Sequence, residues 1–239
     1  AVNQKIAPNG STVVKVYFDR QKYTLTFTYG DKDDGSLPNV IYRDVKYGAP
    51  IYEPKMNLGG YLFSGWEDGM TFTDADGSPT QTMPAGDTSY AASWTPDSST
   101  PYRVEYYVQD TKEDKYYYSS ARAGTGATDT AVDLTPYHDA GGGLSLNKVT
   151  VKGTEVQTGD DLLRIKGDGS LVIKLYFDRS EYEVSFDAGG GTAVESQIVR
   201  HEGKVLEPAV PARTGYTFAG WINGETVWDF GKDIVTGDI

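Results

Sequence analysis

A seven-residue pattern, Gly-Tyr-x-Phe-x-Gly-Trp, occurs twice in this chain, at residues 60–66 and 215–221. A second string also recurs, as Lys-Val-Tyr-Phe-Asp-Arg at residues 15–20 and as Lys-Leu-Tyr-Phe-Asp-Arg at residues 174–179. Each Phe-Asp-Arg is followed, after two residues, by a tyrosine that opens an alternating run. A repeat in fixed order predicts an array of small units before any single residue is interpreted. The chain therefore consists of two kinds of module in alternation.

The runs after these tyrosines alternate between apolar and polar side chains. Residues 23–29 carry a large apolar or aromatic side chain at every second position, and residues 102–108 and 182–186 follow the same pattern. A period of two is typical of a strand with one buried and one wet face. The content of 18 tyrosines and 28 glycines also favours strands and turns. We expect a mainly β fold, α+β at most.

Helical segments are expected to be short. Three segments, residues 45–57, 130–138 and 203–213, are the best candidates, and each contains a proline. Since proline ends a helix or confines it to its first turn, we expect one or two helical turns in each segment.

The repeats divide the chain into four parts. Residues 1–20 are expected to be the C-terminal strand of a truncated module of the first kind, which ends in Phe-Asp-Arg. Residues 23–94 form a module with the tryptophan motif, and residues 102–179 form a complete module of the first kind. Residues 182–239 form a second tryptophan-motif module, which we expect to be cut short.

The connections between these parts differ in length. Residues 21–22 and 180–181 are two-residue connections, which leave neighbouring modules little freedom to reorient. Residues 95–101 are longer and contain two prolines, which bias the backbone toward an extended form. We therefore expect a monomer shaped as an elongated rod, a tandem array of small modules.

Composition excludes several classes of function. The formal net charge of −12 disfavours nucleic acid as a partner, because phosphate binding needs clustered lysine and arginine. No apolar run approaches the roughly 18 residues of a membrane span, so we expect no membrane insertion. The absence of cysteine excludes disulfides, a cysteine-zinc site and a cysteine nucleophile.

The sequence shows no nucleophile with its base, no cluster of metal ligands and no phosphate-binding loop. We therefore expect no cofactor, no metal and no enzyme activity. His138 and His201 lie in different modules, whereas a zinc site needs three or more ligands. Asp31–Asp34 and Asp74–Asp76 faintly resemble calcium loops, but the second lacks the acidic residues of that pattern at loop positions 1 and 12. Ordinary aspartate–glycine turns explain both segments better.

Exposed tyrosines are the open functional signal. Tyr107 and Tyr176 fall on the predicted polar faces, and Tyr117 lies in a run of three tyrosines of which at least one must point outward. Such rings either stack on sugars or form a protein interface, or they pair across strands and shield the sheet. Trp66 and Trp221 of the repeated motif are expected to be core anchors.

The residues of the last module resemble a known family. Tyr-Glu-Val-Ser-Phe-Asp-Ala-Gly-Gly-Gly-Thr from residue 182, the motif at residues 215–221 and Trp-Asp-Phe from residue 228 resemble the internalin B-type, or Listeria–Bacteroides, repeat. Residues 23–94 are similar to it, with a longer acidic loop and without the Trp-Asp-Phe string. Residues 102–179 look like a mucin-binding-protein-type module, on the basis of the Tyr-x-Val-x-Tyr opening and the Val-Ile-Lys-Leu-Tyr-Phe ending.

The family resemblance implies a β-grasp-like fold in bacterial surface proteins and carries no catalytic residues. It predicts an extracellular stalk or adhesin segment, anchored to the cell wall or secreted, that spaces or presents a distal domain. Two alternatives stay open. One is a module that binds glycan or host protein through exposed tyrosines, and the other is an accessory region of a secreted enzyme.

Overall fold

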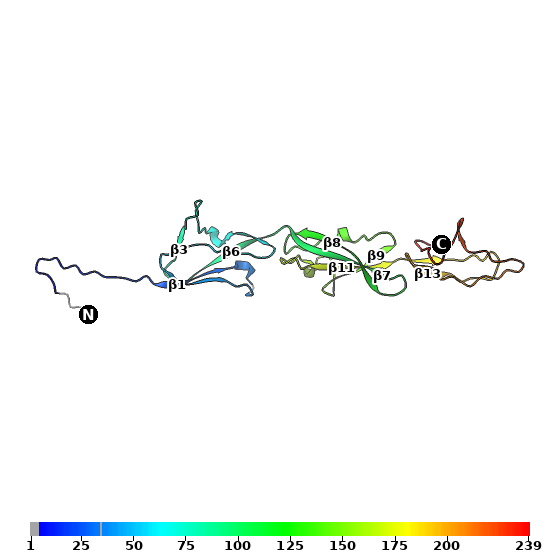
Figure 1. Ribbon diagram of the computed structural model, residues 1–239, viewed down its shortest axis with the longest axis horizontal. Coiled ribbons are helices and arrows are strands. Elements are labelled where there is room, and N and C mark those ends of the chain that lie inside the picture. Colours follow the sequence, from blue (N-terminus) through cyan, green and yellow to red (C-terminus); the bar gives the residue numbers. More distant parts are fainter. Residues whose placement is uncertain (1–4, 34) are drawn as a thin grey trace. The chain divides into compact units, whose positions relative to one another are not determined.

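The computed structural model describes residues 5–33 and 35–239, and it consists of several small β-sheets (Figure 1). The helical segments in this part of the chain are four 3-10 turns of three residues each. The mainly β class predicted from alternation is therefore confirmed. No helix within these residues has the length and apolar character needed to cross a membrane.

The chain divides into two compact units. The first comprises the residues up to Leu58 together with Leu62–Thr95, and the second comprises Gly59–Tyr61 together with Pro96–Ile239.

The first unit is built around one four-stranded sheet in the order β2-β1-β6-β4. These strands are β1 (Lys22–Thr28), β2 (Val40–Lys46), β4 (Tyr61–Trp66) and β6 (Thr88–Pro96). The central strand β1 pairs antiparallel with β2 and parallel with β6 (Figure 1). A parallel neighbour requires a crossover, which the intervening residues supply.

The remaining elements of the first unit lie in the connections between these strands. They are η1 (Gly30–Lys32), η2 (Glu67–Gly69) and the two-residue strands β3 (Pro50–Ile51) and β5 (Gln81–Thr82), which pair antiparallel. Phe27 and Phe72 are fully buried, and Trp66 is 5% exposed. The rings of Phe27 and Trp66 lie 4.9 Å apart, so the motif tryptophan is a core anchor here, as predicted.

The second unit contains a five-stranded sheet in the order β10-β9-β11-β7-β8. Its strands are β7 (Thr100–Gln109), β8 (Tyr116–Gly126), β9 (Leu144–Val151), β10 (Thr154–Val156) and β11 (Val172–Arg179). The turns η3 (Thr135–Tyr137) and η4 (Asp161–Leu163) lie in its connections. Strand β11 runs parallel to β7 and antiparallel to β9, and its Ile173, Leu175 and Phe177 are fully buried.

The last part of the second unit has two short hairpins. One joins β12 (Glu181–Val184) to β13 (Gln197–Arg200), and the other joins β14 (Ile222–Asn223) to β15 (Thr226–Val227). Four buried valines form a small core, and two of them, Val184 and Val199, lie on β12 and β13. Trp221 is only half-buried, so its predicted role as a core anchor is only partly realised.

Two sequence-based expectations need correction. Of the three predicted helical segments, only residues 130–138 contain a helical turn, the 3-10 turn η3. Residues 45–57 form the end of β2, a non-helical turn and β3. Residues 203–213 contain no helix. Prolines at positions 50, 54, 136, 208 and 211 interrupt the three segments, and the interior of a helix does not accept proline.

The strand predicted within residues 1–20 is absent from the described part, residues 5–20. Val14, Val16 and Phe18 are 78%, 70% and 89% exposed. Their counterparts in β11 are buried because β7 and β9 flank that strand, and no strand within the described residues flanks residues 14–18. A single strand without neighbours has no partners for its backbone groups. Residues 1–4 of this predicted strand lie outside the described residues.

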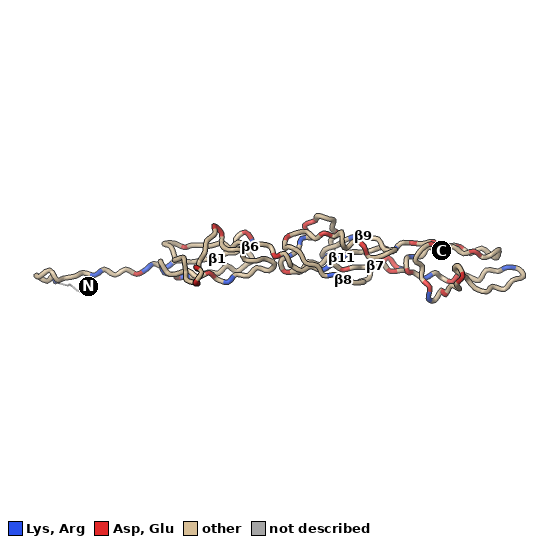
Figure 2. The backbone as a smooth tube through the Cα atoms, turned by 90° about the horizontal axis from the view of Figure 1, so that it is seen from above, with Lys and Arg blue, Asp and Glu red and all other residues tan. Residues whose placement is uncertain are grey.

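Charged residues of both signs are interspersed along the backbone of each unit (Figure 2). In the sequence as a whole, 34 acidic residues outnumber 22 basic ones.

Candidate functional site

Two of the three candidate tyrosines come together on the outer face of the five-stranded sheet. Tyr107 of β7 pairs directly with Tyr176 of β11, and their rings stack with centroids 5.1 Å apart. Tyr118 lies edge-on to Tyr107 at 5.9 Å, and Tyr116 lies edge-on to Tyr176 at 5.3 Å. These four rings, the tyrosine face, form a continuous row across three strands.

Tyr117 does not belong to the tyrosine face. It is opposite Val108 in the pairing of β7 with β8, one residue out of step with Tyr116 and Tyr118, and it is 55% exposed. Successive side chains of a strand point to opposite sides, so the run of three tyrosines is split between the two faces. The three candidates therefore do not form one site.

Charged side chains cover the tyrosine face. The Lys174 ammonium lies 5.2 Å from the centre of the Tyr107 ring, and that of Lys148 lies 5.3 Å from the centre of the Tyr176 ring. Glu105 accepts hydrogen bonds from Arg103 at 2.9 Å and from the Tyr107 hydroxyl at 3.1 Å. The Arg103 hydrogen bond is the main cause that lowers the pKa of Glu105.

A small polar cluster fixes the Tyr116 end of the tyrosine face by hydrogen bonds. The Tyr116 hydroxyl donates to the Asp178 carboxylate, and Asn147 donates to the same carboxylate at 2.6 Å. Burial, followed by the Asp178 contact, raises the pKa of Tyr116 to about 12. The arrangement fits cross-strand packing, with lysines over Tyr107 and Tyr176, whereas Tyr118 at the other end is 53% exposed.

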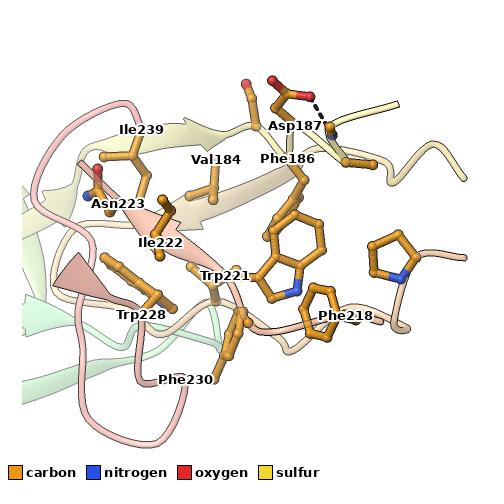
Figure 3. A pocket seen from close by; sticks show the side chains of 16 residues that line it. Val184, Phe186, Asp187, Phe218, Trp221, Ile222, Asn223, Trp228, Phe230 and Ile239 are labelled. Carbon is orange, nitrogen blue, oxygen red and sulfur yellow. Dashed lines mark hydrogen bonds between the residues drawn. The ribbon is translucent and has the colours of Figure 1, made fainter. Parts of the chain in front are cut away.

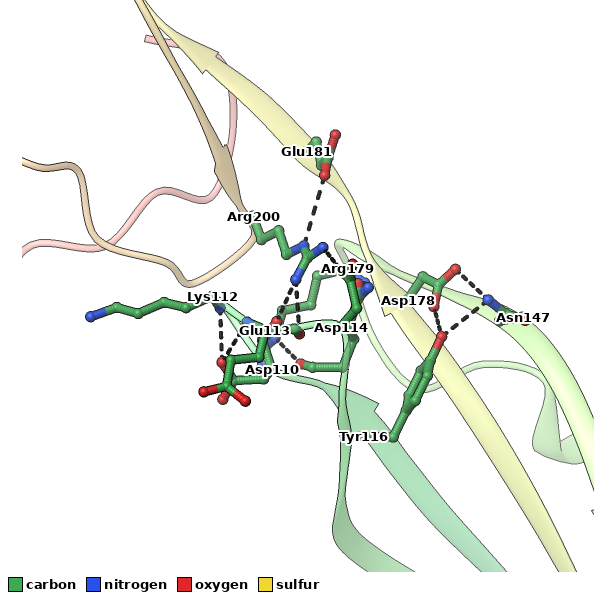
Figure 4. A network of polar contacts seen from close by, with 11 residues as sticks. Asp110, Lys112, Glu113, Asp114, Tyr116, Asn147, Asp178, Arg179, Glu181 and Arg200 are labelled. Atoms are coloured by element: carbon green, nitrogen blue, oxygen red, sulfur yellow. Dashed lines mark hydrogen bonds and ion pairs between the residues drawn. The ribbon is translucent and has the colours of Figure 1, made fainter. Parts of the chain in front are cut away.

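A second polar site lies where the module of residues 102–179 meets the module of residues 182–239, and we call it the joint (Figure 4). At its centre is Arg179, the last residue of the second Phe-Asp-Arg. Its Nε donates to the carbonyl oxygen of Gln109 at 2.8 Å, and its Nη1 donates to the carbonyl oxygen of His201 at 2.9 Å. The Glu202 carboxylate lies 2.5 Å from Nη1, and this contact lowers the pKa of Glu202.

Arg200 holds the joint from the other module. Its guanidinium donates to the carbonyl oxygen of Glu113 at 2.9 Å, to that of Asp110 at 3.3 Å, and to the Asp114 carboxylate (Figure 4). The Asp110 carboxylate accepts hydrogen bonds from the backbone amides of Lys112 and Glu113, which lower its pKa. These bonds hold the β7–β8 turn in the form that presents its carbonyl groups to Arg200.

The backbone also crosses the joint. The His201 amide donates to the carbonyl oxygen of Ser180 at 2.7 Å, and the Ser180 amide donates to that of Gly143 at 2.8 Å. A Cβ atom on Gly143 would lie 2.2 Å from Nδ1 of His201, and Gly143 has a φ of +74°. Only glycine fits this position, because its backbone is left-handed and the imidazole packs directly against it.

The first unit contains part of this arrangement around Arg20, the last residue of the first Phe-Asp-Arg. Its Nη1 donates to the carbonyl oxygen of Tyr47 at 3.2 Å, as Arg179 does to His201. The Tyr47 amide donates to the carbonyl oxygen of Gln21 at 2.8 Å, as that of His201 does to Ser180. Lys46, at the end of β2, stands in the place of Arg200.

Sequence reasoning noticed the repeated Phe-Asp-Arg but assigned no role to its arginine. The signal was available, since the arginine is retained in both copies, two residues before the next module begins. Its acceptors, however, are backbone carbonyl groups, which no sequence pattern marks.

The structure offers no metal-binding cluster in the described part of the chain, where no group of three or more histidine, aspartate or glutamate side chains converges. In the segment Asp74–Asp76, the Asp74 carboxylate accepts bonds from the amides of Asp76 and Ser78, which is an aspartate turn. Asp34, part of the other calcium-like segment, lies outside the described residues. His138 and His201 make no common site with a third ligand among those residues.

Comparison with known families supports the repeat assignment. Residues 182–239 match the family model described as the Listeria-Bacteroides repeat domain, and residues 58–98 match the model described as the divergent InlB B-repeat domain. The resemblance predicted for the last module is thereby confirmed, and that for residues 23–94 is confirmed over its second part. Neither match extends over the module of residues 102–179, whose mucin-binding-type resemblance stays a prediction.

Two relatives come from Evansella cellulosilytica. The chain is 25% identical over 227 residues to a protein provisionally named a Gly-rich membrane protein, a match that covers 91% of this chain and 24% of the relative. It is 30% identical over 69 residues to a protein provisionally named a membrane protein, covering 28% of this chain and 10% of the relative. The chain thus spans about a quarter of the length of the first relative.

Proposed function

We propose that this chain is a non-enzymatic repeat segment of a bacterial cell-surface protein, where it spaces or presents a distal domain. One observation carries the proposal. The arginine of Phe-Asp-Arg donates to a carbonyl oxygen in the turn after the second strand of the following module in both copies, from Arg20 to Tyr47 and from Arg179 to His201. A contact that recurs between a connection and the module after it is what a repeating spacer needs, because it fixes the direction in which the chain enters each module.

The contacts at the joint support a stiff connection. Arg179 is 15% exposed and Arg200 is 18% exposed, and both donate to more than one acceptor. A planar guanidinium with several fixed acceptors loses little further freedom and resists bending about a two-residue connection. Surface ion pairs alone would not achieve this, since each is worth about 0–1 kcal/mol.

The family matches and the names of the relatives support an extracellular, surface-associated location. The proposal includes four further properties: a β-grasp-like fold, attachment to the cell wall or secretion, a monomeric state and an elongated array of modules. A spacer of this kind needs no catalytic residues, no cofactor and no metal ion.

A second candidate function is recognition of glycan or host protein through the tyrosine face. The stacked pair Tyr107 and Tyr176 favours it, because sugars bind on aromatic planes. Against it, Lys148 and Lys174 already lie over these rings. Titration with glycans, followed by tyrosine fluorescence, distinguishes the two functions. The remaining alternative, an accessory region of a secreted enzyme, is tested by the full-length gene.

The stiffness of the joint tests the spacer proposal directly. The chain has no cysteine, so spin labels attach only where cysteines are introduced. Exposed Glu155 and exposed Lys232 are suitable sites, one on each side of the joint. We expect a narrow distance distribution in the otherwise native chain and a broader one after Arg179→Gln with Arg200→Gln.

A label pair within one module provides the control. Glu155→Cys with Ser119→Cys lies on β10 and β8 of the same sheet and should stay narrow in both backgrounds. A broad distribution across the joint in the native background would contradict the proposal. So would equal widths with and without the two arginines.

A further inference from the structure

The imidazole of His201 is a titratable group that takes no part in the hydrogen bonds of the joint. His201 lies in the turn after β13, and its Nδ1 atom is buried without a hydrogen-bond partner among the described residues. Buried polar atoms of side chains usually have such a partner. This atom is therefore sensitive to the one chemical change that adds a hydrogen to it, which is protonation of the ring.

The ring of His201 is held in place by its packing. A Cβ atom on Gly143 would lie 2.2 Å from Nδ1 and 2.3 Å from Cγ, so the ring rests directly on the backbone of this glycine. Tyr182 of β12 lies edge-on to the imidazole, with the ring centroids 6.0 Å apart. Bulk solvent does not reach Nδ1 in this arrangement.

Protonation changes what this position requires. A neutral imidazole with its hydrogen on Nε2 has none on Nδ1, and such an atom needs no acceptor. The charged ring carries a hydrogen on each nitrogen, so Nδ1 becomes a donor. Because a charged donor that is buried without an acceptor is strongly unfavourable, the charged ring of His201 fits its place poorly.

Charged groups surround the His201 turn, and the carboxylates among them already have partners. Glu202 is paired with Arg179, Asp114 and Glu181 with Arg200, Glu113 with Lys115, and Asp110 and Asp139 with backbone amides. The pKa of Glu202 is lowered mainly by the Arg179 hydrogen bond, and His201 adds a smaller effect. A charged ring therefore competes with Arg179 for the Glu202 carboxylate.

We propose that His201 is a pH switch of the joint. The neutral ring packs on Gly143 and leaves Arg179 bound to the His201 carbonyl oxygen and to Glu202. The charged ring leaves Gly143, competes with Arg179 for Glu202, and thereby loosens the connection of residues 180–181. This inference rests on the proposed role of the joint as a stiff connection.

The first unit provides an internal comparison, because Tyr47 occupies the place of His201 there. Arg20 donates to the Tyr47 carbonyl oxygen at 3.2 Å, and the Tyr47 amide donates to the Gln21 carbonyl oxygen at 2.8 Å. A phenol stays neutral at acidic pH, whereas histidine gains its charge between about pH 8 and about pH 5. The switch is therefore expected at His201 and not at Tyr47.

The last module should respond measurably, because its core is small and open. An apolar pocket of about 470 Å³ borders two of its buried valines, Val184 and Val205, and is also lined by Phe186, Trp221 and Trp228 (Figure 3). A module with few buried side chains is marginally stable. Loss of the contacts at the joint should therefore open its backbone hydrogen bonds more often.

Hydrogen exchange of two backbone amides tests the switch in the native chain. The Ser180 amide donates to the Gly143 carbonyl oxygen at 2.8 Å, and the His201 amide donates to that of Ser180 at 2.7 Å. Between about pH 7.5 and about pH 5.5 we expect the protection factors of both amides to fall about tenfold, because these bonds open when the ring leaves. The protection factor of the Tyr47 amide should stay constant.

Variants of the two histidines provide matched controls. His201→Phe keeps an uncharged ring on Gly143, and His201→Gln is a second uncharged variant in case the first does not fold. Either variant should keep the protection of the Ser180 amide constant over this pH range. His138→Gln, which removes the other histidine of the chain, should retain the fall. A fall that persists in the His201 variants overturns the switch.

The spin labels at Glu155 and Lys232 separate this inference from the proposed function. A distance distribution that is narrow at the higher pH and broader at the lower pH supports both. A distribution that is narrow at both values overturns the switch and leaves the spacer proposal standing. A distribution that is broad at both values contradicts the spacer proposal, and the switch falls with it.

Discussion

The Arg179 guanidinium donates to the main-chain carbonyl oxygen of His201 at 2.9 Å, across the two-residue connection between two modules. The same side chain bonds the end of β7 at Gln109. One residue therefore binds the end of the first strand of one module and the turn after the second strand of the next.

Replacing Arg179 by glutamine should destabilise the last module by about 1–3 kcal/mol, because several charge-assisted hydrogen bonds are lost at a mostly buried position. Arg179→Lys should recover little, since an ammonium group cannot reach two acceptors with a fixed fork. Urea unfolding followed by tryptophan fluorescence measures both. Lys232→Ala, which removes an exposed ion pair in the same module, should leave the unfolding curve unchanged.

Gly143→Ala should loosen the joint, because the added Cβ would lie 2.2 Å from the His201 ring. Gly141→Ala is the matched control, since Gly141 also has a positive φ but has no atom within 4 Å of such a Cβ. We expect a larger drop in melting temperature for Gly143→Ala than for Gly141→Ala. Equal drops would show that only backbone strain matters here.

Trp66→Ala should destabilise the first unit by about 3–5 kcal/mol, the cost of a large cavity in a closed aromatic core. Trp221→Ala should cost less, about 1–2 kcal/mol, because its indole is half-buried beside a pocket. Thermal unfolding of the two variants measures the difference. An equal loss would indicate that the last module is as tightly packed as the first.

The raised pKa of Tyr116 predicts that the folded protein loses stability at alkaline pH. Its pKa is about 12 in the folded protein against an ordinary value of 10.0. A raised pKa gives stability that is present below pH 10.0 and is lost as the pH rises toward about 12. Tyr116→Phe should flatten the fall in melting temperature over this window. It should also remove one late-titrating phenol at 295 nm, leaving those of Tyr102, whose pKa is also raised to about 12, and of Tyr106, whose pKa is raised by burial.

Tyr176→Ala should destabilise the five-stranded sheet by about 1 kcal/mol or more, because its ring stacks on Tyr107 and meets Tyr116. Tyr117→Ala should change stability little, since that ring is 55% exposed and lies off the tyrosine face. Chemical denaturation distinguishes the two variants. A stable Tyr176→Ala protein that loses glycan binding would favour the recognition function instead.

The sequence by itself determined the two recurring strings and the mainly β character of the chain. Alternation with a period of two is a local property, and it reports directly which side chains of a strand face a core. For this reason the alternation in residues 23–29 correctly places Leu25 and Phe27 on one buried face. The recurrence of two strings likewise marked the order of the modules without reference to any contact.

The tertiary structure decided which strands are neighbours, and therefore what the candidate residues touch. Tyr107 and Tyr176 are 69 residues apart in the sequence, and they stack because β11 pairs parallel with β7 in that register. Tyr117, next to Tyr116, falls on the other side. Residues 14–18 have the pattern of β11 but no flanking strands among the described residues, so they form no strand. A local pattern records a preference for burial, whereas strands, pockets and the arginine joint need partners that only the folded chain brings together.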